Sequence, residues 1–189
     1  MNRLEKAIQF MRAAHEGQKR RDGIRDYAVH PLDVYERVSK LVTDEDVLIA
    51  ALFHDIIEDV YPLRPEIYAA TREFAGPRAW GFILELTDIY TKEDFPELNR
   101  KARKQKERER YSRMSVQARL IKLADIISNS SDLDATDAGF ARMYLREKEQ
   151  CLRFLTGSVA DKNWWAALSV LSIDAAEIIR EQQEKFDVR

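Results

Sequence analysis

The chain has 189 residues, of which 45% are hydrophobic and 34% charged, and its net charge is −2. This composition excludes a disordered chain, and the slightly negative charge gives no support for nucleic-acid binding. The length suits one domain over residues 1–189, and the scarcity of Gly and Pro favours helices over a turn-rich β fold. The charged N-terminus, the absence of an apolar run of about 20 residues and the single cysteine, Cys151, predict a cytoplasmic protein without a membrane partner or an intrachain disulfide.

Apolar residues recur at helical spacing along the whole chain, and Gly and Pro fall between the periodic segments. A break is expected at Gly76-Pro77, and caps are expected at Thr43 or Asp44 and at Ser115. The sequence therefore predicts an all-α, single-domain helical bundle. Its helices should cover about 4–15, 30–41, 47–59, 66–74, 79–89, 95–110, 116–128, 137–154 and 163–186.

The third predicted helix contains charged residues where its pattern predicts burial. Its sequence VLIAALFHDIIEDV is hydrophobic almost all round, yet it includes His54, Asp55, Glu58 and Asp59. Buried carboxylates cost several kcal/mol unless they are paired or bind a metal. The spacing of four within each pair, His54 with Glu58 and Asp55 with Asp59, predicts that these four polar groups converge on one wall of the core.

A second apolar helix repeats this anomaly. In ARLIKLADIISN, Asp125 lies among aliphatic residues and Asn129 follows one turn later, while His30 precedes the Pro that starts another helix. Each residue alone is more often a satisfied core residue or a cap than a functional group. Together, two imidazoles and two carboxylates form a donor set that suits a divalent ion with mixed nitrogen and oxygen preference, such as Mn²⁺, Fe²⁺ or Zn²⁺.

The order His30, His54-Asp55, Asp125 resembles the H…HD…D pattern of the HD phosphohydrolase superfamily. More narrowly, the chain resembles the hydrolase domain of RelA/SpoT proteins over its first two-thirds. Four segments carry the likeness: AHEGQKR at 14–20, YAVHP at 27–31, AALFHDIIED at 50–59, and IKLAD at 121–125 with Asn129. The segment Gly23-Ile24-Arg25-Asp26-Tyr27 departs from the family's Gly-x-Pro-Tyr turn, being one residue longer and lacking Pro.

The resemblance implies a role for each matching residue. The implied metal ligands are His30, His54, Asp55 and Asp125, with Mn²⁺ as the family's metal and Fe²⁺, Co²⁺, Zn²⁺, Ni²⁺ or Mg²⁺ as ions for the same site. Glu58 and Asp59 would serve catalysis, Arg20 and Arg21 would recognise the base, and Asn129 would contact the sugar. The implied reaction removes the 3′-pyrophosphate of (p)ppGpp, giving GDP or GTP plus pyrophosphate.

One segment concentrates positive charge. Residues 99–113 hold eight Lys or Arg and two Glu, so the rest of the chain carries −8. We expect Arg100, Lys101 and Lys104, with Arg142 as a lesser candidate, to contact substrate phosphates. The remainder of the segment, Lys106 to Arg110, is expected to form a solvated helix face.

Two alternatives stay open at this stage. The chain could be an HD phosphohydrolase that acts on another nucleotide or nucleotide cofactor, which a preference for 5′-only over 3′-phosphorylated nucleotides would reveal. It could instead be a non-catalytic nucleotide-binding helical domain, against which the intact Glu58 and Asp59 argue. A small nucleotide is the expected partner, no nucleic acid is expected, and the oligomeric state is left open.

Overall fold

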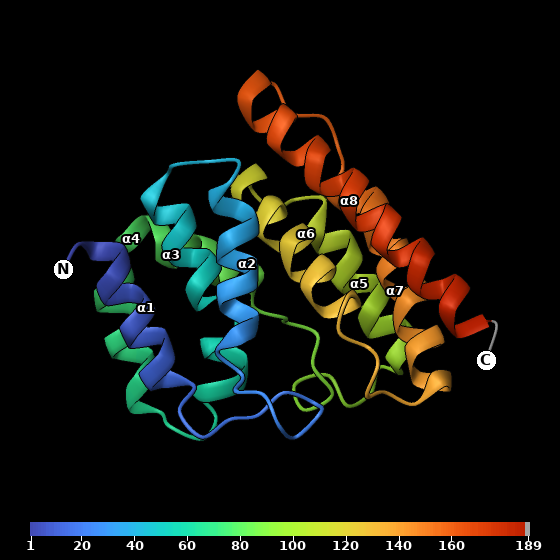
Figure 1. The fold of residues 1–189 in the computed structure, drawn as a ribbon, viewed down its shortest axis with the longest axis horizontal. Coiled ribbons are helices and arrows are strands. Elements are labelled where there is room, and N and C mark those ends of the chain that lie inside the picture. The colour runs from blue at the N-terminus through green and yellow to red at the C-terminus, as the bar shows by residue number, and fades with distance from the viewer. Residues whose placement is uncertain (188–189) are drawn as a thin grey trace. The chain divides into compact units, whose positions relative to one another are not determined.

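The computed structural model describes residues 1–187, which group into two compact units: Met1–Thr87 and a second unit that begins at Asp88. Every regular element among the described residues is a helix, apart from one isolated β-bridge between Lys19 and Asp26 (Figure 1). The all-α prediction is therefore confirmed, whereas the single domain over residues 1–189 stays a prediction. Within the same residues, no helix combines the length and hydropathy needed to cross a membrane.

The first unit is built around one fully apolar helix. It contains α1 (Arg3–Ala14), α2 (Val29–Ser39), α3 (Glu45–Phe53), the π-helix η1 (Ile56–Val60) and α4 (Glu66–Leu86). All residues from Val47 to Phe53 are buried, since α3 packs against α1, α2 and α4. A helix that is hydrophobic on every side is stable only when it is enclosed in this way.

The predicted helix over 47–59 is wrong in its second half. The α-helix ends at Phe53, and after His54 and Asp55 the chain continues as a π-turn in which the amide of Tyr61 donates to the carbonyl of Ile56 at 3.0 Å. The His54 ring contributes to this break, because its Nδ1 bonds the carbonyl oxygen of Ala51 in the last α-turn at 2.9 Å. Single π-turns inside helices occur frequently at functional sites.

The break predicted at Gly76-Pro77 is confirmed. Gly76 has φ 74° and ψ 169°, so it interrupts the helical backbone within the span Glu66–Leu86. A positive φ favours glycine, which has no Cβ to clash. The carbonyl of Ala75, directly before the break, accepts a hydrogen bond from Arg3 Nη2 at 2.7 Å.

The second unit contains α5 (Arg100–Tyr111), α6 (Val116–Ser130), α7 (Ala138–Leu155) and α8 (Lys162–Asp187). In this unit α8 packs on α6 and α7, and α5 packs on α7. The cap predicted at Ser115 is confirmed, because its Oγ accepts from the amide of Ala118 at 3.2 Å. The basic helix begins at Arg100 rather than near 95, because Asn99 caps it by accepting from the amide of Ala102.

The solvated face expected around residues 106–110 is wrong for two members. Glu107 is only 1% exposed, because its carboxylate accepts from the amides of Ile89 and Tyr90 at 2.6 Å each. Arg108 is 6% exposed, and its guanidinium donates to Gln105. A charge run read from sequence cannot reveal such backbone hydrogen-bond donors, which keep a buried carboxylate satisfied.

Asp44 is expected to stabilise the start of α3 in a pH-dependent way. Its side chain accepts from the amide of Asp46 at 3.2 Å and forms a two-bond pair with Arg78 at 2.7 and 2.6 Å. This pairing holds the pKa of Asp44 below its usual value. Replacing Asp44 with Ala should therefore lower the free energy of unfolding by about 1 kcal/mol at pH 7, a figure that allows for solvent screening of a partly exposed pair.

The sign of the pH dependence follows from the lowered pKa. The stabilisation is present above the unfolded-state pKa of about 4 and is lost as pH falls through the folded-state value. Urea unfolding at pH 7 and pH 3 should show a difference between wild type and Asp44→Ala that shrinks in acid. Asp33→Ala, which removes an exposed pair with Arg37, is the control and should change stability less. An equal loss at both pH values would contradict the assignment.

Candidate metal centre

Three of the four predicted metal ligands lie together in the first unit. His30 comes from α2, His54 follows the last residue of α3, and Asp55 is next in the chain. The Nε2 atoms of the two histidines are 3.2 Å apart, and they lie 3.2 and 3.1 Å from the two carboxylate oxygens of Asp55. One ligand-type atom from each residue fits within 4.8 Å, a spacing that allows all three to bind one ion.

The hydrogen bonds of this cluster favour a cation over a purely structural role. Because His54 Nδ1 donates to the Ala51 carbonyl, Nε2 is the ring nitrogen of His54 that is left to bind a cation, and it faces His30 Nε2. Both histidines are 2% exposed, so water has little access to these two nitrogens. A metal-binding His commonly donates its other ring nitrogen to a carbonyl in this manner, and the donor set therefore fits a divalent ion.

The electrostatics differ between the two aspartates of this segment. Burial raises the pKa of Asp55, but the neighbouring His54 and His30 outweigh it and hold that pKa well below its usual value. Burial and the charge of Asp55 together raise the pKa of Asp59. Asp55 is thus an anionic ligand candidate, while Asp59 is more readily protonated than an ordinary aspartate.

Sequence reasoning missed one residue at this cluster. The hydroxyl of Tyr27 donates to Asp55 Oδ2 at 2.7 Å, and burial raises the Tyr27 pKa further above its usual value, so the phenol remains a donor. Two signals could have found it: Tyr27 begins the segment YAVHP that carries the family likeness, and it lies three residues before His30, whose ring is 5.9 Å from its own.

The predicted catalytic pair lies in η1, beside the metal cluster in sequence, with unequal exposure. Asp59 is half-buried, and its backbone carbonyl accepts from Gln18 Nε2 at 3.0 Å. Glu58 is exposed, so the expectation that all four polar groups of this segment face one wall of the core is wrong. The π-turn changes the angular spacing of the side chains, which is why helical periodicity misplaces Glu58. The catalytic roles of both residues stay predictions.

The segment from Gln18 to Tyr27 forms a closed loop that carries Arg20 and Arg21. Backbone bonds join Arg20 to Arg25 at 2.9 Å and Tyr27 to Gln18 at 3.0 Å, and Gly23 turns the chain with φ 71°. Inside the loop, Asp22 accepts from the amides of Ile24 and Arg25. Arg20 lies half-buried with its guanidinium 5.7 Å from the Tyr27 ring, whereas Arg21 is exposed.

The other predicted site residues lie in the second unit. In α6, Asp125 is buried, and it accepts from Asn129 Nδ2 at 2.6 Å and pairs with Lys122 at 2.9 Å. In α5, Arg100 forms a two-bond pair with Glu147, Lys104 pairs with Asp88 at 3.1 Å, and Lys101 is exposed. Arg142 in α7 donates to the carbonyl of Phe186. Roles in binding metal or substrate stay predictions for all of these residues.

Comparison with known proteins supplies the family. The chain matches the family model described as an HD domain over residues 7–150. The chain belongs to the HD domain family. A solved structure, described as a metazoan ortholog of SpoT that hydrolyses ppGpp and plays a role in starvation responses, aligns with it at a TM-score of 0.74 and 26% identity, covering 96% of each chain.

The curated relatives of this HD domain chain are named for the hydrolysis of (p)ppGpp. The MESH1 guanosine-3′,5′-bis(diphosphate) 3′-pyrophosphohydrolases are 33% identical in Drosophila melanogaster, over 67% of this chain and 66% of that protein, and 32% identical in Xenopus tropicalis, over 75% of each. The bifunctional (p)ppGpp synthase/hydrolase SpoT of Escherichia coli is 31% identical over 78% of this chain, which spans only 20% of SpoT.

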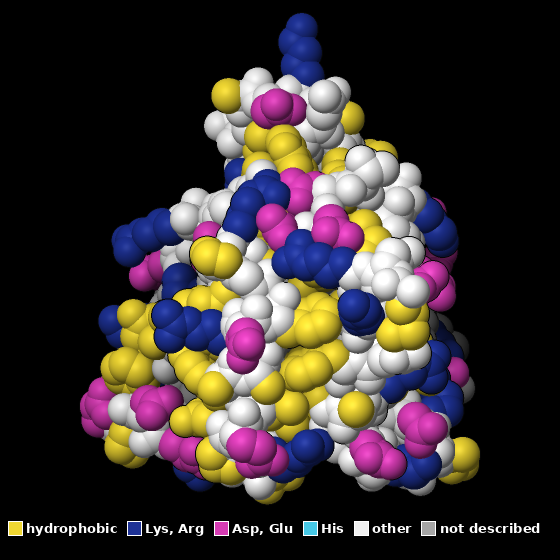
Figure 2. Space-filling model, turned by 90° about the vertical axis from the view of Figure 1, so that its left-hand side faces the viewer, with side chains coloured by type: hydrophobic (Ala, Val, Ile, Leu, Met, Phe, Trp, Pro, Cys, Tyr) yellow, Lys and Arg dark blue, Asp and Glu magenta, His cyan; other side chains and the backbone are white. Residues whose placement is uncertain are grey.

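The histidines of this HD domain are withdrawn from its surface. His15, His30 and His54 are each 2% exposed. Figure 2 shows one face of the molecule on which Lys, Arg, Asp and Glu side chains are interspersed and no histidine is visible. This face therefore offers no metal ligand of the imidazole type.

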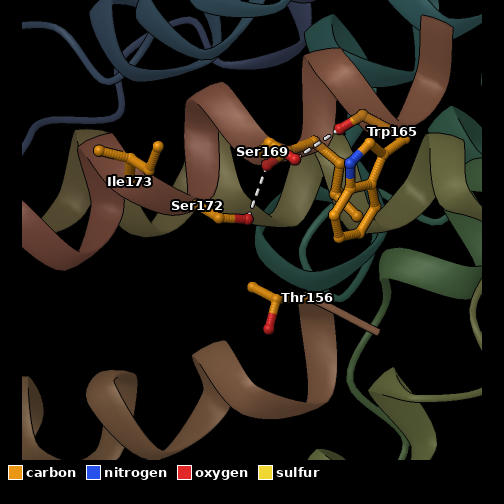
Figure 3. Close-up of a pocket in the computed structure, with 6 residues that line it drawn as sticks. Thr156, Trp165, Ser169, Ser172 and Ile173 are labelled. Carbon is orange, nitrogen blue, oxygen red and sulfur yellow. Dashed lines mark hydrogen bonds between the residues drawn. The ribbon is translucent and has the colours of Figure 1, made fainter. Parts of the chain in front are cut away.

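A separate pocket in the second unit of the HD domain has no acidic or basic side chain in its lining. It has a volume of about 260 Å³ and is lined by Thr156, Trp165, Leu168, Ser169, Ser172 and Ile173 (Figure 3). Two of its hydroxyls are already used within α8, because Ser169 donates to Trp165 O at 2.8 Å and Ser172 to Leu168 O at 2.6 Å. None of the lining residues ionises near neutral pH, so this pocket is not a candidate active site.

Proposed function

We propose that the chain is a metal-dependent hydrolase that removes the 3′-pyrophosphate from (p)ppGpp, giving GDP or GTP and pyrophosphate. The observation that carries the proposal is the cluster of His30 Nε2, His54 Nε2 and Asp55, in a chain whose family relatives are named for this reaction. A purely structural domain has no need to hold two imidazole nitrogens 3.2 Å apart beside a carboxylate.

The proposed metal is Mn²⁺, held by His30, His54 and Asp55 and completed by Asp125. Two nitrogens and two carboxylates suit Mn²⁺ as well as Fe²⁺, Co²⁺ or Zn²⁺, whereas Mg²⁺ prefers oxygen alone. The inclusion of Asp125 rests on its place in the H…HD…D order. When bound, a divalent ion acidifies a coordinated water and polarises a phosphoryl oxygen.

Glu58 and Asp59 are proposed to handle the protons of the hydrolysis. In this reaction the water oxygen bonds to the phosphorus attached to O3′, the bond from that phosphorus to O3′ breaks, and O3′ gains a proton. A Glu58 carboxylate oxygen would take the proton of the attacking water. Asp59, whose pKa is raised by burial and by Asp55, is the better candidate to return a proton to O3′.

The residues proposed to contact the substrate differ in how far their present protein partners limit that contact. Arg20 and Arg21 lie on the closed loop, where a guanidinium can stack on a purine. Asn129 would bind ribose hydroxyls. Of the basic residues, Lys101 is exposed, whereas Arg100, Lys104 and Arg142 would have to give up or share their present protein partners to bind phosphate.

Metal removal provides the direct test of the proposed function. The purified protein should convert ppGpp to GDP and pyrophosphate in the presence of Mn²⁺, lose this activity in a chelator and regain it when Mn²⁺ is restored. Products are followed by ion-exchange chromatography. Protein that holds metal yet leaves ppGpp intact would remove the alarmone assignment while keeping the hydrolase site.

One observation favours a second candidate substrate, which is another nucleotide or a nucleotide cofactor. The loop at residues 23–27 lacks the family's Pro, and Ile24 at its tip is 79% exposed, so we expect its selectivity for the base to differ from that of the relatives. A panel of 5′-only nucleotides and nucleotide cofactors, assayed with Mn²⁺, separates this alternative from (p)ppGpp hydrolysis. Binding without turnover of every compound would instead support a non-catalytic nucleotide-binding domain. A cytoplasmic location and the lack of a nucleic-acid partner stay predictions.

A further inference from the structure

Tyr27 makes contacts that connect the closed loop with the metal cluster. Its hydroxyl donates to Asp55 Oδ2 at 2.7 Å. Its ring stacks on His15, with centroids 4.9 Å apart and planes at 24°, and its edge meets His30 at 5.9 Å and 78°. One side chain therefore touches a candidate ligand carboxylate, a candidate ligand imidazole and a third, buried imidazole.

The contact with Asp55 determines how that carboxylate can turn. Oδ1 faces His54 at 3.1 Å, while Oδ2 lies 3.2 Å from His30 and accepts the hydrogen bond from Tyr27. Rotation of the carboxylate about its Cβ–Cγ bond would break the Tyr27 bond, which is shorter than either histidine contact. A donor to a ligating carboxylate fixes its orientation in this way and so favours metal binding.

The position of Tyr27 is itself fixed by the loop. Its backbone amide donates to the carbonyl of Gln18 at 3.0 Å. The Gln18 side chain bonds His15 Nδ1 at 2.6 Å through Oε1 and the carbonyl of Asp59 at 3.0 Å through Nε2. His15 is 2% exposed and supports the Tyr27 ring from one face. The loop, η1 and the Asp55 carboxylate are thus joined by a continuous set of contacts.

We propose that Tyr27 is a positioning residue, which holds the Asp55 carboxylate in the orientation needed for metal binding and transmits the position of the loop 18–27 to the metal centre. The inference rests on the metal site of the proposed function, and it does not depend on which nucleotide is hydrolysed. Tyr27 touches no reacting atom in this scheme; it acts through Asp55, and its hydroxyl also interacts with the Asp59 carboxylate.

The test compares Tyr27→Phe with wild type by titration calorimetry of the metal-free protein with Mn²⁺. The variant keeps the ring and its stacking but loses the hydroxyl, so its affinity for Mn²⁺ should fall about 10- to 100-fold. The unfolding midpoint of the metal-free protein should change little, whereas the rise in that midpoint on adding Mn²⁺ should be smaller. Tyr68→Phe is the matched control, since that ring contacts Tyr61 and Trp80 instead, and its Mn²⁺ affinity should equal that of wild type.

Two further measurements separate positioning from simple packing. Co²⁺-loaded Tyr27→Phe should show an altered visible absorption spectrum, which reports the ligand geometry. If wild type hydrolyses ppGpp, excess Mn²⁺ should restore most of the variant's kcat, as it would not for a lost catalytic group.

The inference is overturned by unchanged Mn²⁺ affinity and an unchanged Co²⁺ spectrum in Tyr27→Phe, by an equal loss in Tyr68→Phe, or by wild type that binds no divalent ion. Weaker metal binding in Tyr27→Phe, in a protein without activity toward ppGpp, would instead support the positioning role and reject only the substrate assignment. If Tyr27→Phe proves unstable, Gln18→Met tests the same support from the loop side, since it removes both side-chain hydrogen bonds of Gln18 without adding charge and should also weaken Mn²⁺ binding.

Discussion

Changing Asp55 to Asn is expected to abolish tight metal binding and, with it, hydrolysis. Asp55 is the carboxylate that lies within 3.2 Å of both His30 and His54, so the substitution removes the negative charge from the centre of the cluster. An amide is a weak ligand for a divalent ion compared with a carboxylate. We expect the Mn²⁺ affinity to fall by more than about 100-fold, which is a larger loss than that expected from removing a residue that only hydrogen-bonds a metal ligand.

The Asp55→Asn variant should still fold. Asn has nearly the same volume as Asp, and its carbonyl oxygen can accept the Tyr27 hydroxyl that now binds Oδ2. Metal content after dialysis against Mn²⁺, together with circular dichroism, provides the measurement. Asp33→Asn serves as control, because Asp33 pairs with Arg37 on the exposed side of α2. Full metal occupancy in Asp55→Asn would remove Asp55 from the ligand set.

Glu58→Gln and Asp59→Asn are expected to separate catalysis from metal binding. Each substitution removes a proton acceptor or donor while leaving the shape of the side chain, so kcat should fall by about 10²- to 10⁴-fold. Mn²⁺ affinity should stay close to that of wild type, in contrast to Asp55→Asn. Gln18 binds the backbone carbonyl of Asp59 and not its carboxylate, so the link to the loop survives in Asp59→Asn.

Steady-state kinetics with ppGpp at saturating Mn²⁺ measures this separation. The matched control is Glu66→Gln, which changes a first-turn acid of α4 that pairs with Arg64 at the surface. If both η1 variants retain wild-type kcat, the proton-transfer roles are wrong, and the activity must be assigned to other groups. A loss of kcat in one variant alone would support a proton-transfer role for that carboxylate and contradict the role proposed for the other.

The sequence predicts the helices and the grouping of His30, His54 and Asp55 for one shared reason: both depend on residue type and spacing. The apolar run Val47–Phe53 specifies a buried helix, and the charged residues directly after it are anomalous enough to indicate a site. The caps at Asp44 and Ser115 follow from the affinity of short polar side chains for free helix amides.

What the sequence does not predict depends on backbone geometry and on distant partners. The residue types in η1 are those of an ordinary α-helix, so the sequence does not reveal the π-turn. Helical periodicity therefore could not predict that Glu58 is exposed. Tyr27 lies in the matched segment 27–31, but its bond to Asp55 joins residues 28 positions apart, which residue spacing does not reveal. The burial of Glu107 likewise requires amides from a loop 17 and 18 residues away.

The closed loop 18–27 has a consequence for the kinetics of ligand binding. Its backbone is already held by the bonds of Arg20 to Arg25, Gly23 to Arg20 and Tyr27 to Gln18. A ligand that meets a preformed loop loses little free energy to ordering it, so association should resemble the docking of rigid partners. Differences in affinity among nucleotides would then appear mainly in their residence times rather than in their rates of association.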